Sequence, residues 1–399
     1  MELRILATAD LHLGMRFAGY PDLQARLTEA RFATLEALVA RGNAEGCRLL
    51  LVVGDLFHRV SLPQREILRA ADALNGFQGE AVAVLPGNHD YYSGAAGSLW
   101  RSFRERAGDR VLLLAEPRVY DLAHYGLGVR LFPGPCTSKH SRTHALGWLA
   151  ALPSGGVKPA SGGVQPAEGG VKPASGGVQP AKGGVQAAAG GLAIGVAHGA
   201  IEGISPDAQG EYYPMRRAEL DACGLDFWVV GHTHRPPTDA DGSLFIPGTP
   251  EPDGFDCRHA GSALLLEIAA GRVRAERLDM GTFRFRRETL ELAEEEDAGA
   301  AFARFHTPQY ANTLLRLTLR GLLGAEGLRR AHEEVRRLEQ ALPWVQTDDG
   351  ELAERITPER VEAEFARGSF SWLLLRRLLE AGDPEALEQA YALIREVRG

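Results

Sequence analysis

The first part of the chain alternates short apolar runs with longer amphipathic stretches. Residues 3–7, 49–53 and 81–85 are compact aliphatic runs, which are typical of strands buried on both faces. Residues 23–44 carry apolar side chains at a 3.6-residue spacing, as expected of a helix. A second helical stretch begins at Pro63, a residue that is favoured at helix starts. Strands separated by helices predict an α/β layered fold.

The same alternation returns later in the chain and then changes character. Strand-like runs recur at 192–197 and 227–230, and a hairpin is expected around Gly271, between runs at 262–268 and 272–278. After about residue 282 the pattern becomes mixed and more highly charged. There we expect an acidic linker at 291–297, strands at 313–319 and 344–347, and helices at 325–342, 358–381 and 384–397. These observations predict a first domain over 1–281, a smaller α+β cap over 282–350 and a helical tail over 351–399.

A repeat of seven residues interrupts the first domain. Residues 154–188 contain five copies of a unit built on Gly-Gly-Val, followed by Lys or Gln and most often by Pro-Ala. Such a segment offers no face of a helix or strand and cannot bury enough apolar surface to offset the entropy of ordering it. We therefore predict that 154–191 is a flexible insertion in a surface loop.

Composition narrows the class of protein. The chain has 399 residues and a formal net charge of -8, unlike the strongly basic balance of proteins that coat DNA. Its four cysteines form no C-x-x-C pair, so neither a zinc ribbon nor a disulfide framework is indicated. The first residues carry no long apolar stretch with a cleavage site, so we expect no signal peptide, and since no run of about 18 apolar residues appears we expect no transmembrane helix. We expect a cytoplasmic protein that does not associate with a membrane.

Polar side chains follow five of the predicted strands, at the edge of an α/β sheet where ligands bind. They are Asp, Asn and His without Cys, a set that suits Mn, Fe or Zn rather than a thiolate site. An Asp-x-His spacing places two side chains on one face of an extended segment. The same holds for His232 and His234, although a tight turn could splay these two toward different ions. A carboxylate with two oxygens can bridge two cations. The clusters are Asp10-Leu11-His12, Gly54-Asp55, Gly87-Asn88-His89-Asp90, His198 and Gly231-His232-Thr233-His234.

In this order the clusters resemble the signature of the calcineurin-like metallophosphoesterase superfamily: D-x-H, GD, GNH[DE], H and GHxH. The resemblance implies a four-layer sandwich in which two mixed sheets are flanked by helices. It also implies two divalent metal ions, with manganese expected. His89 corresponds to the catalytic histidine and Asp90 to the carboxylate that supports it. By the resemblance, one ion is held by Asp10, His12, Asp55 and His234, and the other by Asp55, Asn88, His198 and His232.

Further motifs resemble the SbcD-like DNA-repair exonuclease family, with the short cap of its divergent bacterial members. The second cluster reads GDLFH, which places His58 three residues after Asp55. The opening ADLHLG and the later FIPGTPEPDGF also resemble that family. The resemblance implies a two-metal DNA exonuclease and endonuclease of double-strand-break repair, with His58 near the DNA backbone. It further implies a homodimer and an SbcC-like SMC-family ATPase as partner.

Other readings remain open at this point. The clusters alone also fit a cytosolic metallophosphatase or a small-molecule phosphodiesterase of the same superfamily. A scaffold subunit with a vestigial site is a third possibility, which the complete set of candidate ligands argues against. The apolar stripes of the last helices could pack on the cap or on each other, or could meet a partner. Six further histidines have no comparable setting and are treated as surface or structural residues: His124, His140, His144, His259, His306 and His332.

Overall fold

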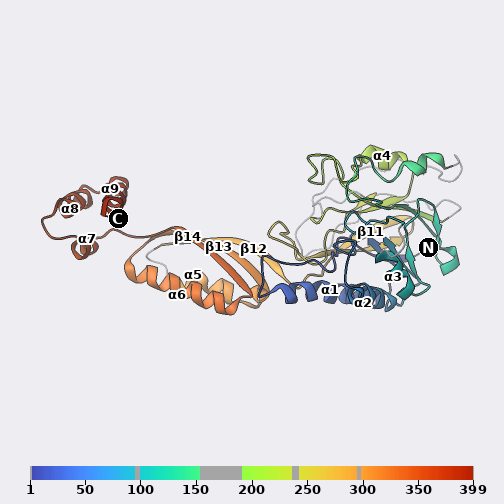
Figure 1. Cartoon of the computed structure of the whole chain (residues 1–399), viewed down its shortest axis with the longest axis horizontal. Coiled ribbons are helices and arrows are strands. Elements are labelled where there is room, and N and C mark those ends of the chain that lie inside the picture. The colour runs from blue at the N-terminus through green and yellow to red at the C-terminus, as the bar shows by residue number, and fades with distance from the viewer. Residues whose placement is uncertain (1, 95–98, 153–190, 236–241, 294–297, 399) are drawn as a thin grey trace. The chain divides into compact units, whose positions relative to one another are not determined.

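A computed structural model describes residues 2–94, 99–152, 191–235, 242–293 and 298–398 (Figure 1). The insertion expected at 154–191 lies outside the described residues, apart from its last position. The chain divides into two compact units, Met1–Phe285 and Arg286–Gly399. Among the described residues, no helix combines the length and apolar character needed to cross a bilayer.

The first unit contains two mixed sheets. In the first sheet the strands run in the order β11-β10-β1-β2-β3-β4, with β1 to β4 parallel and β10 antiparallel to β1. The second sheet has the order β5-β6-β7-β8-β9, and β6 to β9 are parallel. The strands are β1 (Leu3–Thr8), β2 (Leu49–Val53), β3 (Ala81–Leu85), β4 (Val111–Leu113), β5 (Tyr120–Asp121), β6 (Val129–Gly134), β7 (Leu192–His198), β8 (Phe227–Gly231), β9 (Leu244–Phe245), β10 (Ser262–Ala269) and β11 (Arg272–Asp279).

The side chains of each strand alternate between its two faces, and this alternation produces four layers. Successive side chains of a strand point to opposite faces, so Ile5 packs between the two sheets and Leu6 packs toward the helices. Helices α1 to α3 cover the outer face of the first sheet, while α4 lies on the opposite side of the unit (Figure 1). The expected sandwich of two mixed sheets flanked by helices is confirmed. The helices are α1 (Gln24–Ala44), α2 (Gln64–Asn75), α3 (Leu99–Arg106) and α4 (Arg217–Ala222), with 3₁₀ turns at η1 (Leu122–Tyr125) and η2 (Gly147–Ala151).

The second unit combines a three-stranded sheet with helices. Its strands run in the order β12-β13-β14, and β13 and β14 are parallel because α6 crosses between them. Two apolar cores are present, one under the sheet and one among the last three helices. The elements are β12 (Arg284–Leu292), α5 (Ala298–Phe302), η3 (Ala303–His306), η4 (Pro308–Tyr310), β13 (Thr313–Leu323), α6 (Ala325–Ala341), β14 (Trp344–Glu354), α7 (Pro358–Glu364), α8 (Phe370–Ala381) and α9 (Pro384–Arg398).

The boundaries of this unit differ from those expected from the sequence. The first unit extends through Phe285, four residues beyond the expected end of the first domain. Strand β14 continues to Glu354 and so crosses the expected start of the tail at residue 351. The helix expected over 358–381 is two helices, because Gly368 adopts a left-handed φ of 83° and Ser369 caps a new helix by accepting from Trp372 N at 3.2 Å.

Candidate dimetal site

Sharp backbone turns bring the five polar clusters together at the carboxyl ends of β1, β2, β3, β7 and β8. Asp10, His12 and Asp55 have positive φ angles of 55°, 46° and 51°, and His232 has 93°. Such angles are uncommon for residues with a Cβ and concentrate at functional sites. The expectation that Asp10 and His12 share one face of an extended segment is therefore wrong: these side chains converge because the chain turns.

One half of the cluster contains Asp10, His12 and His234. Candidate ligand atoms of these three residues lie within 4.8 Å of one another. His12 Nε2 and His234 Nε2 are 3.0 Å apart. Both carboxylate oxygens of Asp10 accept from the backbone N–H of His232 at 3.1 Å, which fixes the carboxylate beside the final cluster.

The other half contains Asn88, His198 and His232. Asn88 Oδ1 lies 3.1 Å from His198 Nε2 and 3.3 Å from His232 Nδ1. Asn88 is oriented by its amide nitrogen, which donates to the carbonyl of Lys139 at 3.4 Å. His232 and His234 therefore face different halves of the cluster, as a tight turn between them allows.

Asp55 stands between the two halves. Its Oδ2 atom lies 3.6 Å from His12 Nε2 and 3.3 Å from His198 Nε2. Its Oδ1 atom accepts from the backbone N–H of His89 at 2.9 Å. The side chain is almost fully buried, so its charge is poorly screened by water. Asp55 therefore lies close to candidate ligands of both halves.

The hydrogen bonds of His198 direct one of its ring nitrogens toward the other candidate ligands of the second half. His198 Nδ1 lies 3.0 Å from the carbonyl oxygen of Val53, which can only accept, so Nδ1 carries a proton. The remaining nitrogen faces acceptor oxygens of Asp55 and Asn88. Burial lowers the pKa of His198, but attraction to the Asp55 carboxylate outweighs it and raises the pKa to about 9. A divalent cation held by Asp55, Asn88 and His198 would take the place of a proton on this nitrogen.

In the first half, a carboxylate orients His234. That carboxylate belongs to Asp253, a residue without a predicted role. His234 Nδ1 lies 2.6 Å from Asp253 Oδ2. Burial lowers the pKa of His234, yet the hydrogen bond to Asp253 raises it to about 9. A carboxylate on the far nitrogen of an imidazole is the usual support of a metal-ligating histidine, because it directs the other nitrogen toward the ion. Asp253 lies in the PEPDGF turn, whose resemblance was noted without a role for this residue.

His58 and His89 line the edge of the first half. His58 Nδ1 lies 3.4 Å from His12 Nδ1, and the His58 and His89 rings are 5.2 Å apart. His89 Nδ1 lies 3.0 Å from the carbonyl oxygen of His58, so this nitrogen carries a proton. The loops after β1, β2 and β3 supply His12, His58 and His89 respectively.

The expectation that the Asp90 carboxylate supports the ring of His89 is wrong. Its carboxylate accepts from Phe57 N at 3.0 Å and from Gly87 N at 2.6 Å. Asp90 therefore ties the loop after β2 to the loop after β3. Burial, together with the nearby charge of Asp55, raises the pKa of Asp90 to about 8. The ring of His89 is instead oriented by the carbonyl of His58.

Two histidines treated as surface or structural residues lie close to the cluster. His259 Nε2 lies 2.9 Å from the carbonyl of His234. His140 packs against Tyr212, with ring centroids 5.2 Å apart, and Tyr212 packs against His232 at 5.1 Å. Neither residue stands in a motif with recognisable spacing, and only the fold brings them to the site.

A match to a protein-family model identifies the family of the chain. The model described as calcineurin-like phosphoesterase matches residues 3–236, which include all five clusters. The chain belongs to this family. As a member of the calcineurin-like phosphoesterases, it is a metal-dependent hydrolase of phosphoesters, and its candidate ligands fit the paired metal ions of that family.

Distant likenesses to solved structures accompany the match. The protein TT1561 of Thermus thermophilus is 11% identical with a TM-score of 0.38, covering 69% of this chain and 98% of its own. A dimetal phosphatase from Danio rerio is 12% identical with a TM-score of 0.34, covering 70% and 99%. The calcineurin-like phosphoesterase YfkN from Bacillus subtilis is 14% identical with a TM-score of 0.35, covering 69% and 90%. At these scores they add nothing to the family assignment. No curated protein matches the chain.

Proposed function

We propose that this calcineurin-like phosphoesterase is a two-metal DNA nuclease of the SbcD-like type, with exonuclease and endonuclease activity in double-strand-break repair. The observation that carries the proposal is the place of His58, whose ring joins His12 and His89 at the candidate metal site. Burial lowers the pKa of His58 to about 4, so the imidazole is neutral near pH 7. It can donate a hydrogen bond to a phosphate oxygen of a bound strand.

The side chains at the site divide the hydrolysis of a phosphodiester between them. When bound, two divalent ions, with manganese proposed, would activate water and offset the negative charge that develops on the phosphate. Asp10, His12, Asp55, Asn88, His198, His232 and His234 would hold those ions.

His89 would supply the proton that the leaving group needs. Its Nδ1 proton is engaged with the carbonyl of His58, so Nε2 is the nitrogen that can exchange a proton with substrate. A protonated imidazole at this position would donate to the departing alkoxide oxygen. The His58 carbonyl thereby links the GDLFH motif to the orientation of the catalytic ring.

The proposed partners follow from the same assignment. We propose DNA as substrate, an SbcC-like SMC-family ATPase as partner and a homodimer as assembly. The last helices bury apolar side chains against one another, yet Phe370 is 78% exposed, Leu373 54% and Leu393 61%. Large apolar side chains left in water at this level support a docking role for the tail.

A cleavage assay on three forms of DNA tests the proposal. The full chain is incubated with Mn²⁺ and linear duplex, hairpin or single-stranded DNA, with and without an SMC-family ATPase partner. Wild type, Asp55→Asn and His58→Ala are compared, and bis-p-nitrophenyl phosphate serves as a small reference substrate. We expect wild type to degrade DNA, Asp55→Asn to be inactive on every substrate, and His58→Ala to lose more activity on DNA than on the small diester.

The assay also separates the nuclease from its main alternative. A small-molecule phosphodiesterase or phosphatase would turn over the small ester and leave all three DNA forms intact under every condition. That result would overturn the nuclease assignment while leaving the family assignment in place.

A further inference from the structure

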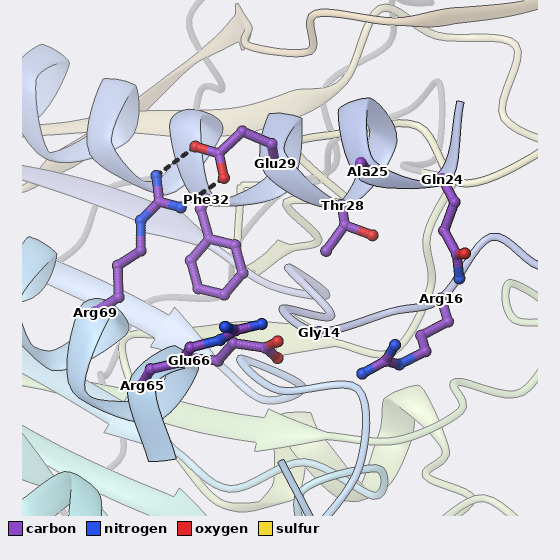
Figure 2. A pocket seen from close by; sticks show the side chains of 10 residues that line it. All are labelled: Gly14, Arg16, Gln24, Ala25, Thr28, Glu29, Phe32, Arg65, Glu66 and Arg69. Carbon is purple, nitrogen blue, oxygen red and sulfur yellow. Dashed lines mark hydrogen bonds and ion pairs between the residues drawn. The ribbon is translucent and has the colours of Figure 1, made fainter. Parts of the chain in front are cut away.

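A cavity of about 500 Å³ lies between α1, the start of α2 and the segment that follows β1. Figure 2 shows its polar side chains extending into the same space. Guanidinium groups come from Arg16, Arg65 and Arg69. The size is in the range of small-ligand sites.

The three arginines of the cavity differ in their partners. Arg69 is occupied: it forms two 2.7 Å hydrogen bonds with Glu29 and a 2.9 Å bond with Glu36, and it covers the ring of Phe32 at 4.7 Å (Figure 2). Arg16 and Arg65 form no ion pair with any residue that the structure describes. Two guanidinium groups without an acidic partner therefore approach one cavity from different elements.

One unpaired carboxylate limits the positive charge of the cavity. Glu66 lines the same space, and its Oε2 atom is buried without a hydrogen-bond partner in the described structure. A Cβ at Gly14 would come within 2.7 Å of that oxygen, and Gly14 has a left-handed φ of 78°. The Glu66 carboxylate thus lies against the backbone of Gly14, and it is the lining carboxylate that opposes the two free arginines, since Glu29 is paired with Arg69.

The segment that follows β1 lines the cavity and also carries the candidate metal ligand His12. Gly14 lies two residues after His12 on the same segment. That segment is bonded to the loop after β2, since Leu13 N donates to Leu56 O at 2.9 Å and His58 N donates to Leu13 O at 3.0 Å. The cavity and the candidate metal site therefore share one backbone segment.

We propose that this cavity is a phosphate-binding subsite in which Arg16 and Arg65 hold a phosphate group. Guanidinium groups match the geometry of phosphate oxygens and stay charged at any working pH. The phosphate comes either from a bound DNA strand or from a free mononucleotide. The first source rests on the proposed nuclease function, whereas the subsite itself does not.

Binding measurements on charge variants test the subsite. A labelled single-stranded oligonucleotide is titrated with the full chain by fluorescence anisotropy, with Ca²⁺ present and over a range of NaCl concentrations. Wild type is compared with Arg16→Ala, Arg65→Ala and Glu66→Gln. Arg104→Ala is the matched control, because Arg104 is an exposed arginine of α3 without an ion pair among the described residues.

The arginine variants and the Glu66 variant should change the affinity for the oligonucleotide in opposite directions. Loss of Arg16 or Arg65 weakens binding about fivefold and lowers the slope of log K against log salt by roughly 0.7, the value for one single-strand phosphate contact. Glu66→Gln removes the opposing charge and tightens binding about twofold at low salt. Arg104→Ala leaves both quantities unchanged. Arginine variants that behave like Arg104→Ala would remove the strand as the source.

A second measurement tests whether a free phosphate compound binds in the cavity, and it separates the subsite proposal from the nuclease proposal. Thermal unfolding of each variant is followed with inorganic phosphate and with thymidine monophosphate. Stabilisation of wild type that Arg16→Ala and Arg65→Ala both lose assigns the cavity to a free nucleotide or phosphate. A chain that fails to cleave DNA but shows this pattern keeps the subsite and loses the nuclease function. No response in either measurement overturns the subsite.

Discussion

The support given by Asp253 to His234 is the residue-scale feature with the most direct consequence for metal binding. We expect Asp253→Asn to lower the affinity for Mn²⁺ by about 10- to 100-fold, because the neutral amide no longer directs His234 Nε2 toward the ion. Isothermal titration calorimetry measures the change. Asp256→Asn is the matched control, since Asp256 is an exposed carboxylate of the same turn. Equal affinities for the two variants would contradict the supporting role.

His89→Ala separates catalysis from metal binding. His89 Nδ1 is engaged with the His58 carbonyl, and its ring lies 4.8 Å from that of His12. We expect the variant to lose about 10²- to 10⁴-fold in kcat on bis-p-nitrophenyl phosphate, the usual contribution of a general acid. It should still bind two Mn²⁺ per chain, as counted by elemental analysis. A loss of bound metal alongside activity would make His89 a ligand instead.

Sequence spacing could identify the side chains that converge but not what holds them. Asp10, Asp55, Asn88 and His198 stand in short motifs after predicted strands, so their assembly at one edge follows from topology. The partner of a side chain has no such signature when it lies far away in the chain. Asp253, for example, is 19 residues from His234. The ring of His89 is oriented by the backbone carbonyl of His58 rather than by Asp90, and any residue could supply such a carbonyl.

At the scale of elements, the turn that ends β2 depends on Gly54. Its φ is 85°, and a Cβ there would lie 1.9 Å from His198 Nδ1, on a side chain that is itself buried. We expect Gly54→Ala to destabilise the fold by more than about 3 kcal/mol and to abolish metal binding, because β2 and β7 must move apart. Urea unfolding with and without Mn²⁺ measures both effects.

Gly46→Ala provides the comparison for that turn. Gly46 has a similar φ of 65°, but nothing lies within 4 Å of the position that its Cβ would occupy. Only backbone strain should appear there, of about 1 kcal/mol. The difference between the two variants therefore measures the close approach of β2 to His198. Similar losses of stability would show that strain alone makes glycine necessary at Gly54.

Elements were predictable where burial imposes a strong pattern. Strands β1, β2 and β3 are sealed between helices and the second sheet, so each is a continuous aliphatic run that stands out in the sequence. Strands of two or three residues such as β4 and β9 are too short to show any period. The break between α7 and α8 was missed because apolar spacing continues across it, and a single cap decides where the helix stops.

At the scale of the whole molecule, charge and composition allowed two domains but could not place their boundary. The apolar and charged patterns change near residue 282, which suggested an end at 281. The rings of Phe283 and Phe285 nevertheless belong to the first unit, where Phe285 packs on Phe255 at 5.3 Å and both phenylalanines are buried. A boundary set by contacts between distant residues leaves little trace in local sequence.

Fragments that end on either side of this segment test the two-unit organisation. All candidate metal ligands and their supporting cores lie within Met1–Phe285, so a fragment of residues 1–285 should fold and bind two Mn²⁺. It should hydrolyse bis-p-nitrophenyl phosphate at a rate close to that of the full chain.

A fragment of residues 1–281 should be much less stable than the longer one. It lacks two buried phenylalanines, worth roughly 3–6 kcal/mol together, and leaves the buried Glu251 carboxylate without the backbone donors of Thr282 and Phe283. Glu251 also accepts from Thr34 of α1, so its loss of partners would reach the helix layer. Urea midpoints compare the two fragments. Equal midpoints would show that residues 282–285 belong with the second unit, and an inactive but folded 1–285 fragment would show that the second unit is needed to complete the site.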